Sequence, residues 1–297
     1  MILVYCYAIA AIVLFLFTKK NLQHNKQRKQ VLWVVQWLQQ LRDLLELFPK
    51  HRGMANAYLK GDTSFRGAME KLQQEADAKL LSMRRQISER REWSDKRILH
   101  AIEEKWQSIK QNVYTMPADR CFYNHSRLIA LVIERLEDDA LELLGFAQRS
   151  TSQQQRHISS IISMLTRELP QVLESIGQAR GIGTGVAAQQ NSSVANRVNL
   201  KYLHSNALSI IDNKLVPLRA SLVQQSEMSQ HSMESCFENA VNASRQFLNL
   251  LKHELIDTPH PTVAPDTYYK QGTVAIEAEF RLFDQLFPQC LKVLGLN

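Results

Sequence analysis

The chain has 297 residues, 45% of them apolar, with only 10 Gly and 8 Pro, which excludes disordered, collagen-like and disulfide-scaffold proteins. Its net charge of +7 comes from 36 Lys and Arg against 29 Asp and Glu. Five of these cations lie between Lys19 and Lys29, before the first acidic residue, Asp43, and leave 31 basic against 29 acidic residues elsewhere. This near balance does not indicate a nucleic-acid-binding face or a direct nucleic-acid partner.

Residues 1–17 form an uncharged apolar segment, about 25 Å of helix at 1.5 Å per residue. We expect a short transmembrane helix here. A cleaved secretory signal is the alternative, but such a signal carries its positive charge before the apolar run, whereas Lys19 and Lys20 follow it. Residues 18–30 are then a basic juxtamembrane linker. Positive flanks stay on the cytoplasmic side, which predicts a single-pass protein of the inner membrane with residues 31–297 in the cytoplasm.

Helical spacing of apolar residues continues through the rest of the chain and predicts no strand. Four amphipathic helices are expected in residues 31–150, with stripes that include Leu38 to Phe48, Met69 to Ile87, Ile98 to Val113 and Ile129 to Leu143. A polar interruption follows at Ser150 to Gln155. Further stripes in residues 156–297 begin at Ile158, Leu200, Phe237 and Ile276.

The two halves also resemble each other in sequence. A shift of 128 positions places Leu45-Glu46 on Leu173-Glu174 and Arg52-Gly53 on Arg180-Gly181. A second echo lies near the last helix of each half, where Pro117 precedes Phe122-Tyr123 and Pro265 precedes Tyr268-Tyr269. The fold class predicted is therefore all-α, with two related antiparallel four-helix bundles after the N-terminal transmembrane helix.

Cysteine and histidine spacing indicates neither a metal site nor a disulfide framework. Cys6, Cys121, Cys236 and Cys290 are far apart, and the nine His residues form no close pair in sequence. No catalytic triad, paired carboxylates or nucleotide loop can be argued from spacing, and the glycines at 181, 183 and 185 are interpreted as helix-packing residues. We therefore expect no enzyme activity, no catalytic residue, no metal and no cofactor.

Arg52 and Arg180 each follow an apolar stripe among small and apolar residues, where a guanidinium is costly to bury without an acceptor. Glu46 and Glu174 lie six positions earlier, about 240° around the helix, and are poorly placed to pair with the Arg of their own segment. The two guanidinium groups could converge on one small planar anion, for which Gly53 and Gly181 would leave room. The alternatives are that both reach solvent or that each pairs with an acid of a neighbouring helix.

The segment Leu44 to Leu59, LLELFPKHRGMANAYL, resembles the first signature of the nitrate- and nitrite-sensing (NIT) domain family. Glu174-x5-Arg180-Gly181 and Tyr268-Tyr269-x3-Thr273-x2-Ile276 are similar to the second half of that domain, so the resemblance covers residues 31–297. It implies two four-helix bundles that bind nitrate or nitrite between helices, with Arg52 and Arg180 at the ligand and with His51, Gly53 and Gly181 beside them. His51 and Ala179 stand where many members carry a charged residue.

Members of this family join the sensor to an output module, and the present chain ends at Asn297 after the sensor. The resemblance thus implies a membrane-anchored nitrate/nitrite sensor that passes its signal in trans to another protein or through a homodimer. The alternative reading is a NIT-like bundle without a ligand that serves as a scaffold or adaptor at the membrane.

Overall fold

A computed structural model describes residues 2–89, 96–147, 152–223 and 230–294, and within these ranges the secondary structure is helical with no strand. The predicted all-α class is confirmed. The side chains of residues 1–21 lie outside the description.

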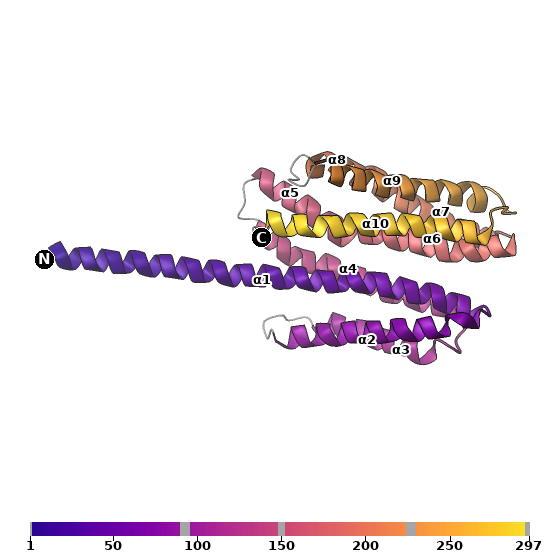
Figure 1. Cartoon of the computed structure of the whole chain (residues 1–297), viewed down its shortest axis with the longest axis horizontal. Helices are drawn as coiled ribbons and strands as arrows, with labels where there is room; N and C mark the ends of the chain where they lie inside the picture. Colours follow the sequence, from indigo (N-terminus) through magenta and orange to yellow (C-terminus); the bar gives the residue numbers. More distant parts are fainter. Residues whose placement is uncertain (1, 90–95, 148–151, 224–229, 295–297) are drawn as a thin grey trace.

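α1 (Ile2–Leu59) is one continuous helix that projects well beyond its neighbours toward the N-terminus (Figure 1). Residues 18–30, expected as a linker between the anchor and the folded region, are helical within it. The reason is local, because neither Gly nor Pro occurs before Pro49 and the basic stretch is rich in the good helix formers Lys, Gln and Arg.

Among the residues that the structure describes, no helix carries an apolar stretch long enough to cross a bilayer. The expected anchor, residues 1–17, falls in the part of α1 whose side chains are outside that description. The membrane anchor therefore stays a prediction.

The first half of the molecule continues with α2 (Arg66–Ser88), α3 (Lys96–Asn112) and α4 (Ala118–Ala147). α1 packs against α2 and α4, and α3 packs against α2 and α4. The predicted stripe on α2 is buried for the most part, at Met69, Ala76, Leu80, Met83 and Ile87.

The second half contains α5 (Ser152–Ser163), α6 (Leu169–Gln189), α7 (Val194–Ile210), α8 (Val216–Val223), α9 (Gln230–Leu251) and α10 (Pro265–Val293). α6 packs against α7 and α10, and α9 packs against α7 and α10. A π-helical segment, Met164–Glu168, connects α5 to α6. It ends just before Pro170, which has no N–H to donate to the helix.

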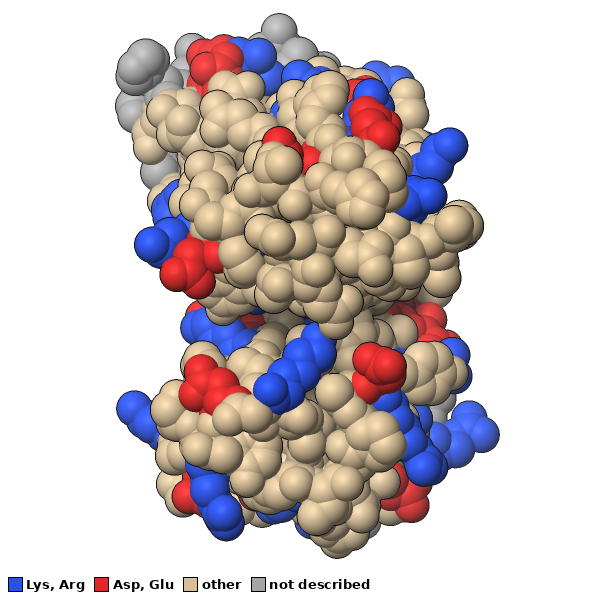
Figure 2. Space-filling model, turned by 90° about the vertical axis from the view of Figure 1, so that its right-hand side faces the viewer, with Lys and Arg blue, Asp and Glu red and all other residues tan. Residues whose placement is uncertain are grey.

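The two halves share one main hydrophobic core and lie one above the other in Figure 1. Contacts of α6 with α1 and α4 join them. Figure 2 views the end of the molecule away from the N-terminus, where a waist separates the halves and residues of both charge signs are interspersed. This face is consistent with the near balance of charge after residue 30.

Candidate functional site

Arg52 lies on α1 with only 2% of its surface exposed, and both terminal nitrogens of its guanidinium donate to protein groups. Nη1 donates to Glu174 Oε1 at 2.6 Å and to Ser126 Oγ at 2.8 Å, and Nη2 donates to Glu174 Oε2 at 3.1 Å. The group also stacks over the ring of Phe122 on α4, 4.8 Å from its centroid. Arg52 is therefore held by a two-point carboxylate, a hydroxyl and an aromatic face.

Arg180, the matching residue of α6, has the same surroundings except for the carboxylate. Nη1 donates to Thr273 Oγ1 at 2.8 Å, and the guanidinium lies over the ring of Tyr269, 4.8 Å from its centroid. Both partners belong to α10, four residues apart, as Phe122 and Ser126 are on α4. The side chain is 9% exposed. The same guanidinium, hydroxyl and aromatic cluster thus lies between α1 and α4 in the first half and between α6 and α10 in the second.

The difference between the clusters comes from the partners of the two matching acids. Glu174 accepts a hydrogen bond from the neutral side chain of Gln178 at 2.7 Å and is left free to pair with Arg52. Glu46, its counterpart on α1, is instead held by two cations, Lys50 at 2.6 Å and Arg42. Burial raises the pKa of Glu46, but the hydrogen bonds and charges of Lys50 and Arg42 outweigh it and lower that pKa overall. Glu46 therefore does not supply a carboxylate to Arg180.

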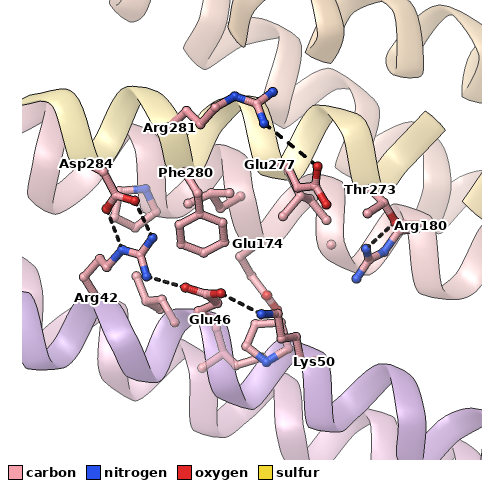
Figure 3. A pocket seen from close by; sticks show the side chains of 17 residues that line it. Arg42, Glu46, Lys50, Glu174, Arg180, Thr273, Glu277, Phe280, Arg281 and Asp284 are labelled. Carbon is pink, nitrogen blue, oxygen red and sulfur yellow. Dashed lines mark hydrogen bonds and ion pairs between the residues drawn. The ribbon is translucent and has the colours of Figure 1, made fainter. Parts of the chain in front are cut away.

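A cavity of about 300 Å³ lies beside Arg180, between α1 of the first half and α6 and α10 of the second. Figure 3 shows the charged side chains along it. Its walls are otherwise largely apolar and are formed by Leu45, Pro49, Ile129, Pro170, Leu173, Ile276 and Phe280. The two halves meet at this cavity, beside the side of Arg180 that corresponds to the side of Arg52 contacted by Glu174.

Four cations line this cavity, and three of them have an acidic partner. Arg42 makes two contacts with Asp284, at 2.9 and 2.8 Å, in addition to Glu46, which also holds Lys50. Arg281 reaches Glu277 at 3.9 Å. Arg180 is the one lining cation with no carboxylate oxygen within 4 Å among the described residues.

Burial in this arrangement disfavours the charged form of Arg180. Burial lowers the pKa of its guanidinium, and the neighbouring charge of Arg52 lowers it further, while Tyr269 and Glu277 act in the opposite direction. Glu277 lines the cavity as well, but its side chain is 62% exposed. A buried cation in this position is stabilised when an anion reaches it.

The predicted site residues do not all meet at this cavity. Arg180 lines it, whereas Arg52 lies behind Gly177, where a Cβ would stand 3.1 Å from Arg52 Nη2. Gly53 is not among the lining residues. Gly181, which the sequence analysis placed beside the ligand, does not line this cavity either, and an added Cβ there would stand 2.8 Å from the ring of Phe122, as expected for a glycine in helix packing.

His51 points into the core of the first half, away from the cavity. Its Nδ1 is 2.8 Å from Nε2 of His125, and the amide nitrogen of Gln73 is 3.1 Å from its Nε2. His125 Nδ1 in turn lies 2.8 Å from the carbonyl oxygen of Cys121. These contacts are all satisfied when both imidazoles are neutral and donate through Nδ1.

Sequence reasoning missed Glu174 as the partner of Arg52 and missed the acids and cations that line the cavity. Thr273 and Tyr269 stood within the segment that resembles the family signature, but without an assigned role. The alternative in which an Arg pairs with an acid of a neighbouring helix describes Arg52 correctly. No group of three metal-ligating side chains occurs among the residues searched, which are those described.

Comparison of the chain with protein-family models, with curated proteins and with solved structures finds no match in any of the three. The similarity to the nitrate- and nitrite-sensing family therefore rests on the short motifs of the sequence alone.

Proposed function

We propose that the cavity beside Arg180 binds a small planar oxyanion, nitrate or nitrite, and that the chain is a sensor of that anion without catalytic activity. The proposal includes two related four-helix bundles with the ligand between them. The first is α1–α4, and the second counts as four helices because α5 continues into α6 and α7 into α8 through π-helical segments, beside α9 and α10. The observation that carries it is the buried guanidinium of Arg180, which faces the cavity with no carboxylate partner among the described residues.

The chemistry of the site supports an oxyanion. A guanidinium is planar and offers paired N–H donors that match two coplanar oxygens. Thr273 accepts from Nη1 of Arg180 and donates to the carbonyl oxygen of Tyr269 at 2.9 Å, so it fixes the orientation of the guanidinium. Thr273 is the hydrogen-bond acceptor of this guanidinium among the described residues, so the other N–H groups of Arg180 remain for a ligand.

The position of the cavity supports a signalling role. Because its walls come from α1 and from α6 and α10, an anion there contacts both bundles and biases how they pack. A coupling free energy of about 1 to 3 kcal/mol is typical of such linkage. We propose that α1 carries the change toward an anchor at residues 1–17 in the inner membrane and that a separate signalling protein or a second copy of the chain receives it.

Calorimetry and thermal denaturation of the full-length chain with nitrate and with nitrite test the proposal. At about 100 times the dissociation constant, the bound anion should add about 2.7 kcal/mol to the free energy of unfolding. Arg180→Ala should remove this gain. Arg245→Ala is the matched control, since Arg245 lies on α9, is 43% exposed and pairs with Asp212 at 2.5 Å. A protein that shows neither heat nor stabilisation with either anion rejects the sensing function.

One observation favours the alternative, a ligand-free scaffold or adaptor at the membrane. Arg52, the counterpart of Arg180, already has an anionic partner within the protein, Glu174. On this reading Arg180 is tolerated as an unpaired buried charge, and Arg180→Met should raise stability without changing any response to anions. The same titrations therefore separate the two functions.

A further inference from the structure

The Arg52 cluster shows how this fold binds a carboxylate. Glu174 presents two oxygens to the two terminal nitrogens of Arg52, at 2.6 and 3.1 Å, while Ser126 and Phe122 complete the surroundings. The Arg180 cluster repeats the guanidinium, the hydroxyl and the aromatic face at the same distances of 2.8 and 4.8 Å. Within the described part of the chain, no carboxylate oxygen lies within 4 Å of this second guanidinium.

The cavity beside Arg180 is much larger than a bare inorganic oxyanion requires. Its volume is about 300 Å³, whereas a water molecule takes about 30 Å³ in the liquid and nitrate has only four heavy atoms. Seven apolar side chains line it beside eight charged ones, and the apolar set includes Phe280 and Ile276 of α10 and Leu45 of α1. A cavity that combines these apolar side chains with one lining cation, Arg180, that has no carboxylate oxygen within 4 Å among the described residues suits a ligand with an apolar body and one anionic group.

We infer that the ligand class of this cavity is a small organic monocarboxylate with an apolar tail. Its carboxylate takes on Arg180 the position that Glu174 takes on Arg52, and its tail lies against Phe280 and Ile276. This inference rests on the proposed anion site at Arg180 and changes its preferred ligand from an inorganic oxyanion to a carboxylate of a few carbons.

A chain-length series tests the inference on the full-length protein. Calorimetric titrations would use formate, acetate, propionate and butyrate, with nitrate and nitrite in parallel and butyramide as the uncharged match for butyrate. Each methylene that becomes buried should tighten binding by up to about fourfold. Butyramide should not bind, because it offers no charge to Arg180.

Two variants locate the ends of the ligand. Arg180→Met should abolish butyrate binding, whereas Arg245→Met, on α9 and not among the residues that line the cavity, should leave it unchanged. Phe280→Ala should weaken butyrate by roughly tenfold and leave formate unaffected, because only the longer acid reaches the ring. Ile276→Ala is the second tail variant in case the first does not fold, and circular dichroism establishes folding for both.

The outcomes separate this inference from the proposed function. Tight nitrate binding with no gain from formate to butyrate overturns the carboxylate inference and leaves the oxyanion sensor standing. Affinity that rises along the series, with nitrate weak or absent, supports the inference and rejects nitrate as the ligand. Failure of every anion to bind rejects both.

Discussion

Arg52 and Glu174 lie 122 residues apart in the chain and form a two-point ion pair across the two halves, at 2.6 and 3.1 Å. Arg52 is nearly inaccessible, and the side chain of Glu174 is 12% exposed. Desolvation offsets much of the attraction in such a pair, so its net contribution to stability is small, but loss of one partner leaves a buried charge. The pair therefore fixes how α1 sits on α6.

Glu174→Ala should lower the free energy of unfolding by about 3 to 5 kcal/mol, because it leaves the Arg52 guanidinium buried without a carboxylate. Formate or nitrate should restore part of this loss, because Arg52 in the variant has no carboxylate from Glu174 and an added anion can bind its guanidinium. Urea denaturation with and without each anion measures both effects. The double variant Arg52→Ala/Glu174→Ala, which has no charge left to compensate, is the control and should gain nothing from anions at this position.

Glu46 should pair with Arg180 when its two present cationic partners, Arg42 and Lys50, are removed. In the variant Arg42→Ala/Lys50→Gln, Glu46 keeps only a neutral neighbour four residues later, as Glu174 does with Gln178. We expect Glu46 to compete for Arg180 and to weaken anion binding at least tenfold, as measured by calorimetry.

Addition of Glu46→Gln to that double variant should restore binding, because the competing carboxylate is then gone. If binding is equally weak with and without Glu46→Gln, the loss comes from Arg42 or Lys50 directly and the competition idea is wrong.

The sequence predicted the helices because they depend on local spacing. The stripe from Met69 to Ile87 is an example, since a period of 3.6 residues fixes which side of α2 is buried. It also indicated correctly that Glu174 does not pair with Arg180, its neighbour on α6. The actual partner, Arg52, depends on how α1 packs on α6, and no spacing within one helix contains that information.

His51 illustrates the opposite error. Its position beside Arg52 in the motif suggested a shared site, but consecutive residues of a helix point about 100° apart. Arg52 consequently faces Glu174 on α6, while His51 faces His125 and Gln73 inside the first half. Pairs such as His51 and His125, 74 residues apart, become visible only when the helices are placed together.

The buried His51–His125 pair should make the protein less stable in acid. Burial lowers the pKa of His51 from 6.5 to about 4, and burial together with the charge of His51 lowers that of His125 to about 3. Below pH 6.5 the unfolded chain therefore binds more protons than the folded one. The free energy of unfolding should be highest above pH 6.5 and should fall by up to about 1.4 kcal/mol per pH unit for each His toward pH 5.

Urea denaturation between pH 7 and pH 5 measures this slope. His125→Gln, which keeps an amide donor for the Cys121 carbonyl but does not titrate, should remove about half of it. His100→Gln is the control, because His100 is 69% exposed on α3 and should leave the slope as it is. An unchanged slope in His125→Gln would contradict the assignment.

Glu279 on α10 should have the opposite pH dependence, because burial raises its pKa from 4.5 to about 7 even though a hydrogen bond from Ser244 lowers it. Ser244 Oγ donates to Oε1 at 2.6 Å, and the buried Oε2 has no hydrogen-bond partner among the described residues. Between pH 4.5 and 7 the folded chain binds more protons than the unfolded one. This carboxyl therefore contributes its full stability below pH 4.5, and the contribution is lost as the pH rises through 7.

Glu279→Gln should remove that loss, because the amide is uncharged and still accepts the hydrogen bond from Ser244. At pH 8 the variant should exceed the wild type in free energy of unfolding by about 3 kcal/mol, and the difference should shrink toward pH 5. Urea denaturation at pH 5, 6, 7 and 8 measures it. Glu277→Gln, an exposed neutralisation on the same helix, should show no such growth with pH. If the two variants behave alike, ionisation of Glu279 does not cause the loss of unfolding free energy between pH 5 and pH 8.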